Sequence, residues 1–427
     1  MNTNTYIKNN LQGESNWYKS HIHCRLCGYD NITMFLDLGF TALADRFITR
    51  EQLHEPEVTY PLRVVRCNEC HFIQLDHTVA PEILYQQDYP YESSTTQTGR
   101  EHFNQFARSI VEEFGFSKGS LAIDIGSNVG VLLGGFKNQG MCVLGIDPAI
   151  NIARIAEKNG IPTIADFFNE ELASRIAEEH GKAMAITASN VFAHIDRLDI
   201  LMRGVRRLLH EDGIFVVEAP YLRNLIRVLE YDTIYHEHLS YLSISPLIRF
   251  FDRMGMALFD VKEVDIHGGS FRLFVCHKGR YPVLTKVLDM QRQEQEEKLH
   301  DLETLNTFAQ RVRNHRNQLR HLLESLRHEG KRIAGVSAPA KGMTLLNYCR
   351  IGTETLEFIT EKTPLKIGRY APGNSLPILP DSALMTGNID YALLLAWNFK
   401  DEIMNNLSEF RKKGGRFIIP IPNPVIV

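Results

Sequence analysis

The sequence lacks the features that would point to a membrane, to export or to a nucleic acid. Its longest apolar runs, such as YALLLAW, have only the length of a strand. The first residues, MNTNTYIKNN, lack the charged and then apolar pattern of a signal peptide. The formal net charge of the 427 residues is -4, and acids alternate with bases between Gln291 and Arg327 as on a solvated helix face. We therefore expect a cytoplasmic protein that binds neither membrane nor nucleic acid, with about two to four domains.

The cysteine pattern also excludes a disulfide framework, because the cytosol keeps thiols reduced. Four of the seven cysteines form two pairs, CRLC and CNEC, separated by residues 28–66. This spacing is longer than in compact zinc ribbons. Two such pairs can still place four thiolates around one ion and leave no position for water, which is the pattern of a structural zinc site. The predicted zinc ligands are Cys24, Cys27, Cys67 and Cys70.

Other cysteines and histidines are weaker candidates for the zinc site, because four thiolates already complete the shell. The nearby histidines that can substitute for a ligand are His21, His23 and His71. Three further cysteines stand alone in apolar segments and are expected in the core. They are Cys142, Cys276 and Cys349.

After residue 80 the composition changes to alternating strand-like and helix-like segments. SLAIDIG reads as a buried strand, SNVGVLLGGFKNQG as a glycine turn running into a helix, and MCVLGID as a second strand. This β-α-β unit predicts a doubly wound domain with its ligand at the carboxyl ends of the strands. A dinucleotide fingerprint needs glycines at offsets zero, two and five, but Asn128 and Val131 follow Gly126 at those offsets. NAD and FAD are therefore disfavoured.

The same turn suits a different cofactor. In DIGSNVG, Asp124 precedes Gly126 and Gly130 follows it, while Asp147 ends the next strand. A glycine turn beside an acid suits a cationic amino-acid tail, and a second acid suits two ribose hydroxyls. This combination predicts S-adenosylmethionine. Further contacts from the turn would come from Ser127 and Asn128.

Two later segments extend the predicted site. ADFFN supplies Asp166 and Phe167, which can meet the edge and the face of an adenine. AMAITASNVFAHI predicts a strand followed by Asn190 and His194. A lone histidine is more often a hydrogen-bonded structural group than a catalyst. A position past the carboxyl end of a strand nevertheless favours a role for His194 in the site.

The stretch TIYHEHLSYLS concentrates titratable side chains in eleven residues. If the segment is extended, His236 and His238 can form a His-x-His metal pair. The helical zinc-protease pattern is excluded, because Ser240 stands where its second histidine belongs. A second interpretation is acid/base chemistry, with one histidine titrating near neutral pH and Glu237 or a tyrosine orienting it. A third is a polar loop that caps neighbouring elements.

The C-terminal third predicts a linker and a further domain. Leucines at helical spacing between Pro282 and Gly330 predict one long amphipathic linker helix, partly solvated. KRIAGVSAPAKGMTLLNYC then repeats the order strand, turn and helix, and LEFITEK, YALLLAWNF and GGRFIIPIP add strands. Lys341 and Gly342 stand at a predicted helix N-terminus, where an ammonium and backbone amides can hold phosphate. A surface lysine after a turn is equally compatible with the spacing. Asn398 follows another strand end.

Taken together, the motifs resemble those of the sugar C-methyltransferases of deoxysugar pathways, across nearly the whole chain. They are CRLC with CNEC, DYPYESS, DIGSNVG, NVFAHI, EYDTIYHEHLSYLS, HGGSFRLFV, APAKGMTLLNY, and LAWNF with GGRFIIPIP. The resemblance implies a zinc-binding module over residues 1–80, an S-adenosylmethionine-dependent methyltransferase domain over 81–282, and a linker helix with a C-terminal domain that contributes to sugar-nucleotide binding over 283–427. The expected fold class is therefore α/β, a small zinc-binding N-terminal module plus two doubly wound Rossmann-like domains.

The resemblance also implies roles for particular residues. His238 matches the catalytic base of the family. The other implied catalytic groups are Tyr235, Glu237, His194 and a tyrosine of DYPYESS, either Tyr89 or Tyr91. The implied substrate-binding residues are Lys341, Gly342, Asn398, Ser270 and Arg272. SN stands where many methyltransferases have Gly-x-Gly, a departure that this family tolerates.

The implied reaction is methylation of the carbon next to the keto group of a nucleotide-diphosphate 4-keto-deoxysugar. Thymidine is the expected nucleoside and C-3 the expected carbon, and the branched-chain product would enter a surface polysaccharide or a glycosylated metabolite. The same chemistry on a guanosine-linked hexose or heptose is one alternative. A non-catalytic zinc- and nucleotide-binding protein is another, although the intact Asp124, Gly126, Gly130 and Asp147 argue against it. A monomeric chain is compatible with all three.

Overall fold

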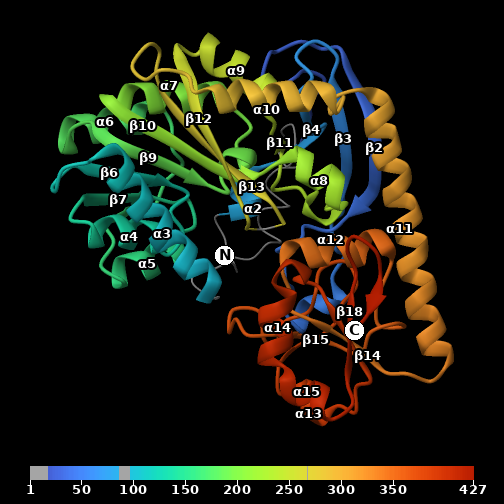
Figure 1. Ribbon diagram of the computed structural model, residues 1–427. Coiled ribbons are helices and arrows are strands. Elements are labelled where there is room, and N and C mark those ends of the chain that lie inside the picture. Colours follow the sequence, from blue (N-terminus) through green and yellow to red (C-terminus); the bar gives the residue numbers. More distant parts are fainter. Residues whose placement is uncertain (1–17, 86–96, 267) are drawn as a thin grey trace, which may run out of the picture.

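The computed structural model describes residues 18–85, 97–266 and 268–427. Figure 1 shows a large sheet with its helices, a smaller antiparallel module beside it, and a C-terminal domain connected to both by long helices. Within the described ranges, every helix is too short or too polar to cross a membrane.

The N-terminal module is an antiparallel sheet with the strand order β11-β4-β3-β2. Three of its strands are consecutive in sequence: β2 (Ile32–Thr41), β3 (Tyr60–Cys67) and β4 (Ile73–Leu75). The fourth strand, β11 (Ser240–Tyr241), comes from far along the chain and pairs with β4. The smaller elements are β1 (Tyr18–Ser20), β5 (His77–Val79), η1 (Glu51–His54) and α2 (Pro81–Tyr85). The antiparallel pair of β2 and β3 occupies most of the chain between the cysteine pairs, which explains their long separation.

The second sheet has seven strands in the order β12-β13-β10-β9-β6-β7-β8. These strands are β6 (Leu121–Ile125), β7 (Cys142–Ile146), β8 (Thr163–Ile164), β9 (Ala183–Ser189), β10 (Leu209–Pro220), β12 (Met256–Val264) and β13 (Ser270–His277). Strands β6 to β10 run parallel, and β13 is antiparallel to both β10 and β12. The order reverses between β6 and β9, so the carboxyl ends of these two strands form the topological switch point where ligands bind in doubly wound sheets.

Helices cover both faces of this sheet. On one face lie α3 (Gln97–Phe114), α4 (Val131–Asn138) and α5 (Ile150–Lys158), which share a buried cluster with the sheet. On the other lie α6 (Glu170–His180), α7 (Leu198–Leu208) and α9 (Ile244–Arg253). Because both faces are covered, the central strands are apolar at consecutive positions, which is why SLAIDIG reads as a buried strand.

The C-terminal domain has six strands in the order β16-β15-β14-β17-β18-β19. They are β14 (Ile333–Val336), β15 (Ile359–Glu361), β16 (Ile378–Pro380), β17 (Tyr391–Leu394), β18 (Arg416–Ile419) and β19 (Val425–Ile426). All pair in parallel except β18 with β19. Its helical elements are α12 (Ala340–Cys349), α13 (Ala383–Thr386), η4 (Trp397–Phe399), α14 (Lys400–Asn406) and α15 (Ser408–Lys412). The predicted second doubly wound domain is thus present.

The expected single linker helix is two helices, α10 (Thr285–Glu296) and α11 (Leu302–His328). Figure 1 shows α10 crossing the top of the seven-stranded sheet and α11 running down to the C-terminal domain. The break lets α10 pack on α9 and β12 while α11 packs on β2 and α12. One face of α11 is buried, which includes Leu319, Leu323 and Leu326.

A single hydrophobic cluster joins the N-terminal module, α11, the C-terminal domain and the segment around residues 222–241. This segment contains α8 (Leu222–Val228), η3 (Tyr231–Thr233) and the YHEH motif. The motif therefore lies where all three parts of the chain meet.

The prediction that Cys142 is a core residue is wrong, because its side chain is exposed, whereas Cys276 and Cys349 are buried. Cys142 begins β7, and the short neighbouring strand β8 pairs only with the other end of β7. The start of β7, which contains Cys142, therefore has no pairing with β8, although the segment is apolar.

Candidate functional site

The four predicted zinc ligands lie together. The sulfur atoms of Cys24, Cys27, Cys67 and Cys70 are all within 4.8 Å of one another. Cys24 Sγ is 3.5 Å from Cys70 Sγ, and Cys27 Sγ is 3.6 Å from Cys67 Sγ. Four thiolates around a zinc ion at about 2.3 Å stand about 3.8 Å apart, so the donor set fits a closed tetrahedral zinc site. Among the described residues, this is the group of potential metal ligands that the structure brings together.

The nearby histidines do not join this cluster. His21 contacts Thr78 and Asp196 instead, and the ring of His71 lies beside that of His300. The backbone carbonyl of His23 accepts a hydrogen bond from Gln74.

The glycine turn after β6 is closely packed against its neighbours. Gly126 and Gly130 have φ values of +68° and +82°, which favour glycine, and Asn128 has a φ of 50°. A Cβ on Gly126 would lie 2.3 Å from a methyl group of Val191, and Gly130 is the N-cap of α4. Both the backbone conformation and the close packing on Val191 therefore require glycine at position 126, at the switch point of the sheet.

Asp147 closes the turn from the end of β7. Its carboxylate accepts hydrogen bonds from the backbone N–H groups of Asn128 at 2.8 Å and Ala149 at 2.9 Å. Each carboxylate oxygen retains a further acceptor position. The side chain of Ser127 is buried beside this turn, and its Oγ has no hydrogen-bond partner among the described residues.

Asp124 is buried at the end of β6 and accepts a hydrogen bond from the hydroxyl of Thr187 at 2.6 Å. Burial raises the pKa of Asp124 to about 7, although the Thr187 hydrogen bond acts in the opposite direction. A cation placed beside Asp124 would favour its ionised form, so the site fits a ligand with an ammonium group.

The other predicted cofactor contacts surround the same edge of the sheet. Asp166 follows β8 and is exposed, and its carboxylate accepts a hydrogen bond from the backbone N–H of Phe167. Phe167 is half-buried. Asn190 follows β9, has a φ of 57°, and donates its backbone N–H to the backbone carbonyl of Glu218 at 2.7 Å. Both segments therefore lie at the carboxyl ends of parallel strands, as the sequence predicts.

His238 has a defined hydrogen-bonding pattern. Its Nδ1 is 2.7 Å from the carbonyl oxygen of Thr233, and its Nε2 is 2.8 Å from the hydroxyl of Tyr235. Because a carbonyl oxygen only accepts, Nδ1 carries the proton in the neutral ring, and Nε2 offers its lone pair to the Tyr235 hydroxyl. In its neutral form, His238 therefore presents Nε2 as its basic atom.

His194 lies beside this imidazole. The two ring centroids are 4.9 Å apart, and the ring of Tyr85 stacks on His194 with centroids 6.1 Å apart. Burial lowers the pKa of His194 to about 4, so the ring is neutral near pH 7. Its Nε2 has no hydrogen-bond partner among the described residues. A neutral imidazole with an uncommitted nitrogen can donate to or accept from a ligand.

Glu237 is buried and close to Tyr85. Burial, and secondly the charge of Glu237, raises the pKa of Tyr85 well above its usual value. Sequence reasoning missed Tyr85, although it lies only three residues before the DYPYESS motif. The predicted Tyr89 and Tyr91 lie outside the described residues.

His236 and His238 do not form a metal pair. His236 is buried, its Nε2 is 3.3 Å from the carbonyl oxygen of Tyr60, and its ring meets the Tyr60 ring edge to face. His238 instead contacts Tyr235 and His194. The two histidines thus contact different groups of residues and cannot bind one metal ion together, which favours the acid/base interpretation of the motif.

Lys341 and Asn398 meet at the start of α12. Lys341 Nζ is 3.4 Å from Asn398 Oδ1 and 4.5 Å from the centre of the Trp397 ring. Trp397 Nε1 donates to Asp232 at 2.7 Å. Gly342 is required by packing, since a Cβ there would lie 2.7 Å from Leu395 Cβ.

Two buried acids in the EYDT motif approach this lysine and were missed by sequence reasoning. Burial raises the pKa of Glu230 to about 7, and burial also raises that of Asp232, while the charge of Lys341 acts in the opposite direction on both. Gly268 leaves room for Glu230, because a Cβ there would clash with its carboxylate. Both acids stand in EYDT, one of the motifs that support the family resemblance. This membership is the signal in the sequence that could have identified them as candidate site residues.

Ser270 and Arg272 have protein partners. Ser270 donates to the carbonyl of Ile266 at 3.1 Å. The guanidinium of Arg272 pairs with buried Glu218 at 2.6 Å and lies 3.5 Å from the centre of the Phe106 ring. These contacts account for their burial, and a role in substrate binding stays a prediction.

The fold, the glycine turn and the acids at the switch point define the class of protein as an S-adenosylmethionine-dependent methyltransferase, with a zinc-binding module attached. Family models match in the same order along the chain: a zinc binding domain at residues 24–85, a methyltransferase domain at 100–261 and a C-methyltransferase C-terminal domain at 265–422.

The chain is 37% identical to the C-methyltransferase NovU of Streptomyces niveus over 407 residues, which covers 95% of this chain and 96% of NovU. It therefore belongs to the C-methyltransferase family. A methyltransferase from Clostridium acetobutylicum is 14% identical over 42% of this chain and 92% of its own, with a TM-score of 0.34. The magnesium protoporphyrin IX methyltransferase of Synechocystis with bound SAH is 13% identical over 44% of this chain and 90% of its own, with the same TM-score of 0.34.

Proposed function

We propose that the protein deprotonates the carbon next to the keto group of a nucleotide-diphosphate 4-keto-deoxysugar and methylates that carbon. The proposed nucleoside is thymidine and the proposed position is C-3, and the branched-chain product is destined for a surface polysaccharide or a glycosylated metabolite. The observation that supports this most directly is the position of the His238 imidazole, which lies beside Tyr235 and His194 and has its Nδ1 on the carbonyl oxygen of Thr233.

Carbon becomes nucleophilic only when a proton next to a carbonyl is removed, so the reaction needs a base and donors for the enolate oxygen. In the proposed step, the C-3 proton moves to Nε2 of His238, and the C–H electron pair moves into the enolate. A base of this kind contributes about 10² to 10⁴-fold to the rate. Thr233 holds Nδ1–H, so the imidazolium that forms is stabilised by a carbonyl acceptor at 2.7 Å.

Tyr235 and His194 are the proposed donors to the enolate oxygen. When substrate binds, Tyr235 would turn its hydroxyl hydrogen from Nε2 of His238 to the enolate oxygen, which frees that nitrogen for the C-3 proton. Neutral His194 can donate from one nitrogen without adding charge to the site. Each good oxyanion donor contributes about 10² to 10³-fold. The buried charge of Glu237 and the ring of Tyr85 would complete the wall of the site.

S-adenosylmethionine would supply an electrophilic methyl group. The residues of this chain that would hold it are at the switch point: Asp124 toward the ammonium, Asp147 toward the ribose hydroxyls, and Asp166 with Phe167 at the adenine. Ser127, Asn128 and Asn190 line the same edge. Loss of the Asp147 carboxylate should weaken cofactor binding by about 1.5 to 3 kcal/mol.

The C-terminal domain would hold the diphosphate. Lys341 lies in the first turn of α12 with Asn398 beside it, and such a helix start combines backbone N–H groups with a cation. The proposal is supported by the position of Glu230 and Asp232, which link this lysine to the motif that carries His238.

The test is mass spectrometry of the protein with methyl-labelled S-adenosylmethionine and a panel of thymidine- and guanosine-diphosphate 4-ketosugars. We expect transfer to carbon with a thymidine-linked sugar, and NMR of the product should place the methyl group at C-3. Methyl transfer to oxygen or nitrogen would contradict C-methylation of the sugar, and a methyl group at C-5 would contradict the position.

A further inference from the structure

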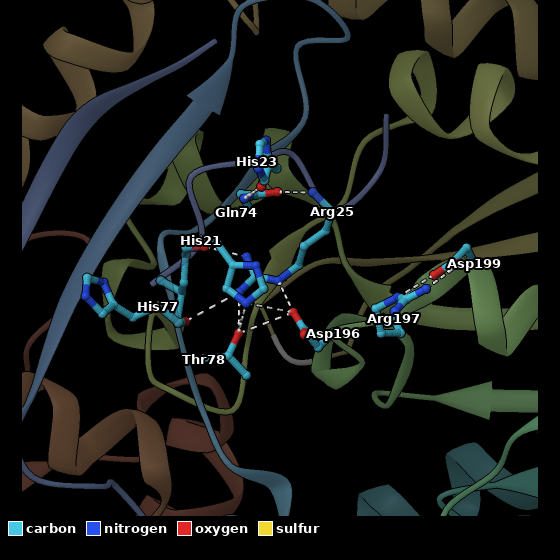
Figure 2. Close-up of polar contacts among 10 residues, drawn as sticks. His21, His23, Arg25, Gln74, His77, Thr78, Asp196, Arg197 and Asp199 are labelled. Carbon is cyan, nitrogen blue, oxygen red and sulfur yellow. Dashed lines mark hydrogen bonds and ion pairs between the residues drawn. The ribbon is translucent and has the colours of Figure 1, made fainter. Parts of the chain in front are cut away.

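Arg25 connects the zinc module to the methyltransferase domain. It lies between the ligands Cys24 and Cys27, and its side chain is only 1% exposed. Figure 2 shows it reaching Asp196, to which Nε donates at 2.8 Å, and its Nη2 donates to Thr78 Oγ1 at 2.6 Å. A buried guanidinium with several acceptors is held firmly, because losing one acceptor leaves a buried charge without a partner.

The module side of this contact is equally well defined. Nη1 of Arg25 donates to the carbonyl of Leu75, and Nη2 is 3.4 Å from the carbonyl of His77. The backbone N–H of Arg25 donates to Gln74 Oε1 at 2.8 Å, and Gln74 Nε2 donates to the carbonyl of His23 at 3.1 Å. The loop that carries the first two zinc ligands is therefore tied to β4 on both sides of Cys24.

Asp196 is the point where these contacts enter the methyltransferase domain. His21 Nε2 is 3.1 Å from Asp196 Oδ1 and 2.8 Å from Thr78 Oγ1. Mainly because it is buried, His21 has a pKa lowered to about 4 and is neutral near pH 7. Arg25 is thus the cation that balances Asp196 from the module.

The segments tied in this way carry the two site histidines. Asp196 follows His194 by two residues. The backbone N–H of Leu239, directly after His238, donates to the carbonyl of Ala193 at 2.8 Å. The carbonyl of Leu239 in turn accepts from the N–H of Leu75 at 2.9 Å. Leu75 therefore holds the His238 segment with its N–H and Arg25 with its carbonyl.

We propose that Arg25 is a positioning residue for the deprotonation, an inference whose catalytic part rests on the function proposed above. Anchored at the zinc site, it holds the His194 segment through Asp196 and the His238 segment through Leu75, and so sets the distance between the two imidazoles. A shift of about 1 Å in reacting groups can lower a rate about 100-fold. The zinc site then contributes to catalysis through geometry, with no contact to substrate.

The test compares Arg25→Ala, Arg25→Lys and Asp196→Asn with the control Arg197→Ala. Arg197 neighbours Asp196 but forms an exposed ion pair with Asp199 at 2.9 Å, directed away from Arg25 in Figure 2. For each full-length variant we would measure zinc content, S-adenosylmethionine affinity, and amide hydrogen exchange in peptides covering residues 192–197 and 236–241. These readouts need no sugar substrate, so they separate the positioning role from the proposed function.

We expect zinc and cofactor affinity to be retained. Exchange should be about tenfold faster in both peptides of Arg25→Ala and in the 192–197 peptide of Asp196→Asn, and it should be unchanged in Arg197→Ala. Arg25→Lys should restore part of the protection. With thymidine-diphosphate-4-keto-6-deoxyglucose, kcat for exchange of the sugar proton should fall about tenfold or more, while the KM for the sugar nucleotide stays unchanged. In the 192–197 peptide, the double variant should exchange no faster than Arg25→Ala alone, because Arg25→Ala already removes the Arg25–Asp196 pair.

Unchanged exchange in Arg25→Ala or Asp196→Asn would overturn the proposal. If Arg25→Ala loses zinc or fails to fold, Asp196→Asn decides, since Asp196 is not part of the cysteine cluster. Faster exchange in both peptides without turnover of any ketosugar in the wild-type protein would support the structural link and contradict the proposed function.

Discussion

Replacing His238 with asparagine tests the proposed base and leaves its surroundings nearly intact. The Nδ1–H of His238 donates to the carbonyl of Thr233 at 2.7 Å, and an asparagine amide can donate from a similar position. The basic Nε2, 2.8 Å from the hydroxyl of Tyr235, has no equivalent in asparagine. The substitution therefore removes the base and keeps the hydrogen bond that orients it.

The expected loss can be separated from a structural effect by its size. Removing a general base lowers the rate by about 10² to 10⁴-fold, which corresponds to about 3 to 5.5 kcal/mol in the activation barrier. The hydrogen bond that Tyr235 loses contributes only about 1 kcal/mol, or about a fivefold effect on a rate. A loss of 100-fold or more at unchanged binding would thus come from the base.

The assay is exchange of the sugar proton with deuterated water, followed by NMR without S-adenosylmethionine, together with calorimetric affinities for cofactor and sugar nucleotide. His236→Asn is the matched control, because His236 is buried against Tyr60 and points away from the site. We expect it to exchange the proton at nearly the wild-type rate. Wild-type exchange in His238→Asn would refute the assignment, and the base would then be His194 or a tyrosine.

Three further outcomes are expected. Cys24→Ser combined with Cys67→Ser should abolish binding of the one zinc ion, seen by elemental analysis, and unfold the N-terminal module first; full zinc content would contradict the four-cysteine site. Gly126→Ala should weaken S-adenosylmethionine binding in calorimetry about tenfold or more because of its φ of +68°, whereas Gly134→Ala, with open space around it in α4, should bind normally. Burial lowers the pKa of His236 to about 4, so the unfolded chain takes up the proton first as pH falls below 6.5, and stability is lost between about pH 6.5 and 4. Between pH 7.5 and 5, the free energy of unfolding measured in urea should therefore fall by about 2 kcal/mol less in His236→Gln than in the wild-type protein. If the free energies of the two proteins fall in parallel over this range, the argument for a neutral buried histidine is wrong.

Much of the fold follows from local sequence patterns. SLAIDIG became β6 and MCVLGID became β7, because strands covered on both faces are apolar at consecutive positions. The start of α12 at Ala340 placed Lys341 and Gly342 as predicted. The linker was mispredicted as one helix because its helical periodicity continues across residues 297–301, where the chain turns for tertiary reasons.

The parts of the candidate site that consist of short sequence motifs could be predicted from the sequence. Cys-x-x-Cys pairs, the glycine turn and YHEH each depend on spacing over a few residues, so the sequence alone pointed to the four cysteines that cluster, to the turn at the switch point and to the two histidines of the motif. Which of those histidines faces the site was not decidable locally. His236 packs on Tyr60 and His238 on His194, and both partners are distant in sequence.

Tertiary structure alone decided which groups from separate segments meet. The approach of Asp232 to Trp397, of Tyr85 to His194 and of Arg25 to Asp196 joins residues far apart along the chain. No periodicity encodes such contacts, because they arise when buried surfaces of three domains pack into one cluster and bring their polar groups into reach. The sequence by itself determined what chemistry each motif can perform, and the packing of the domains determined which of these groups act together.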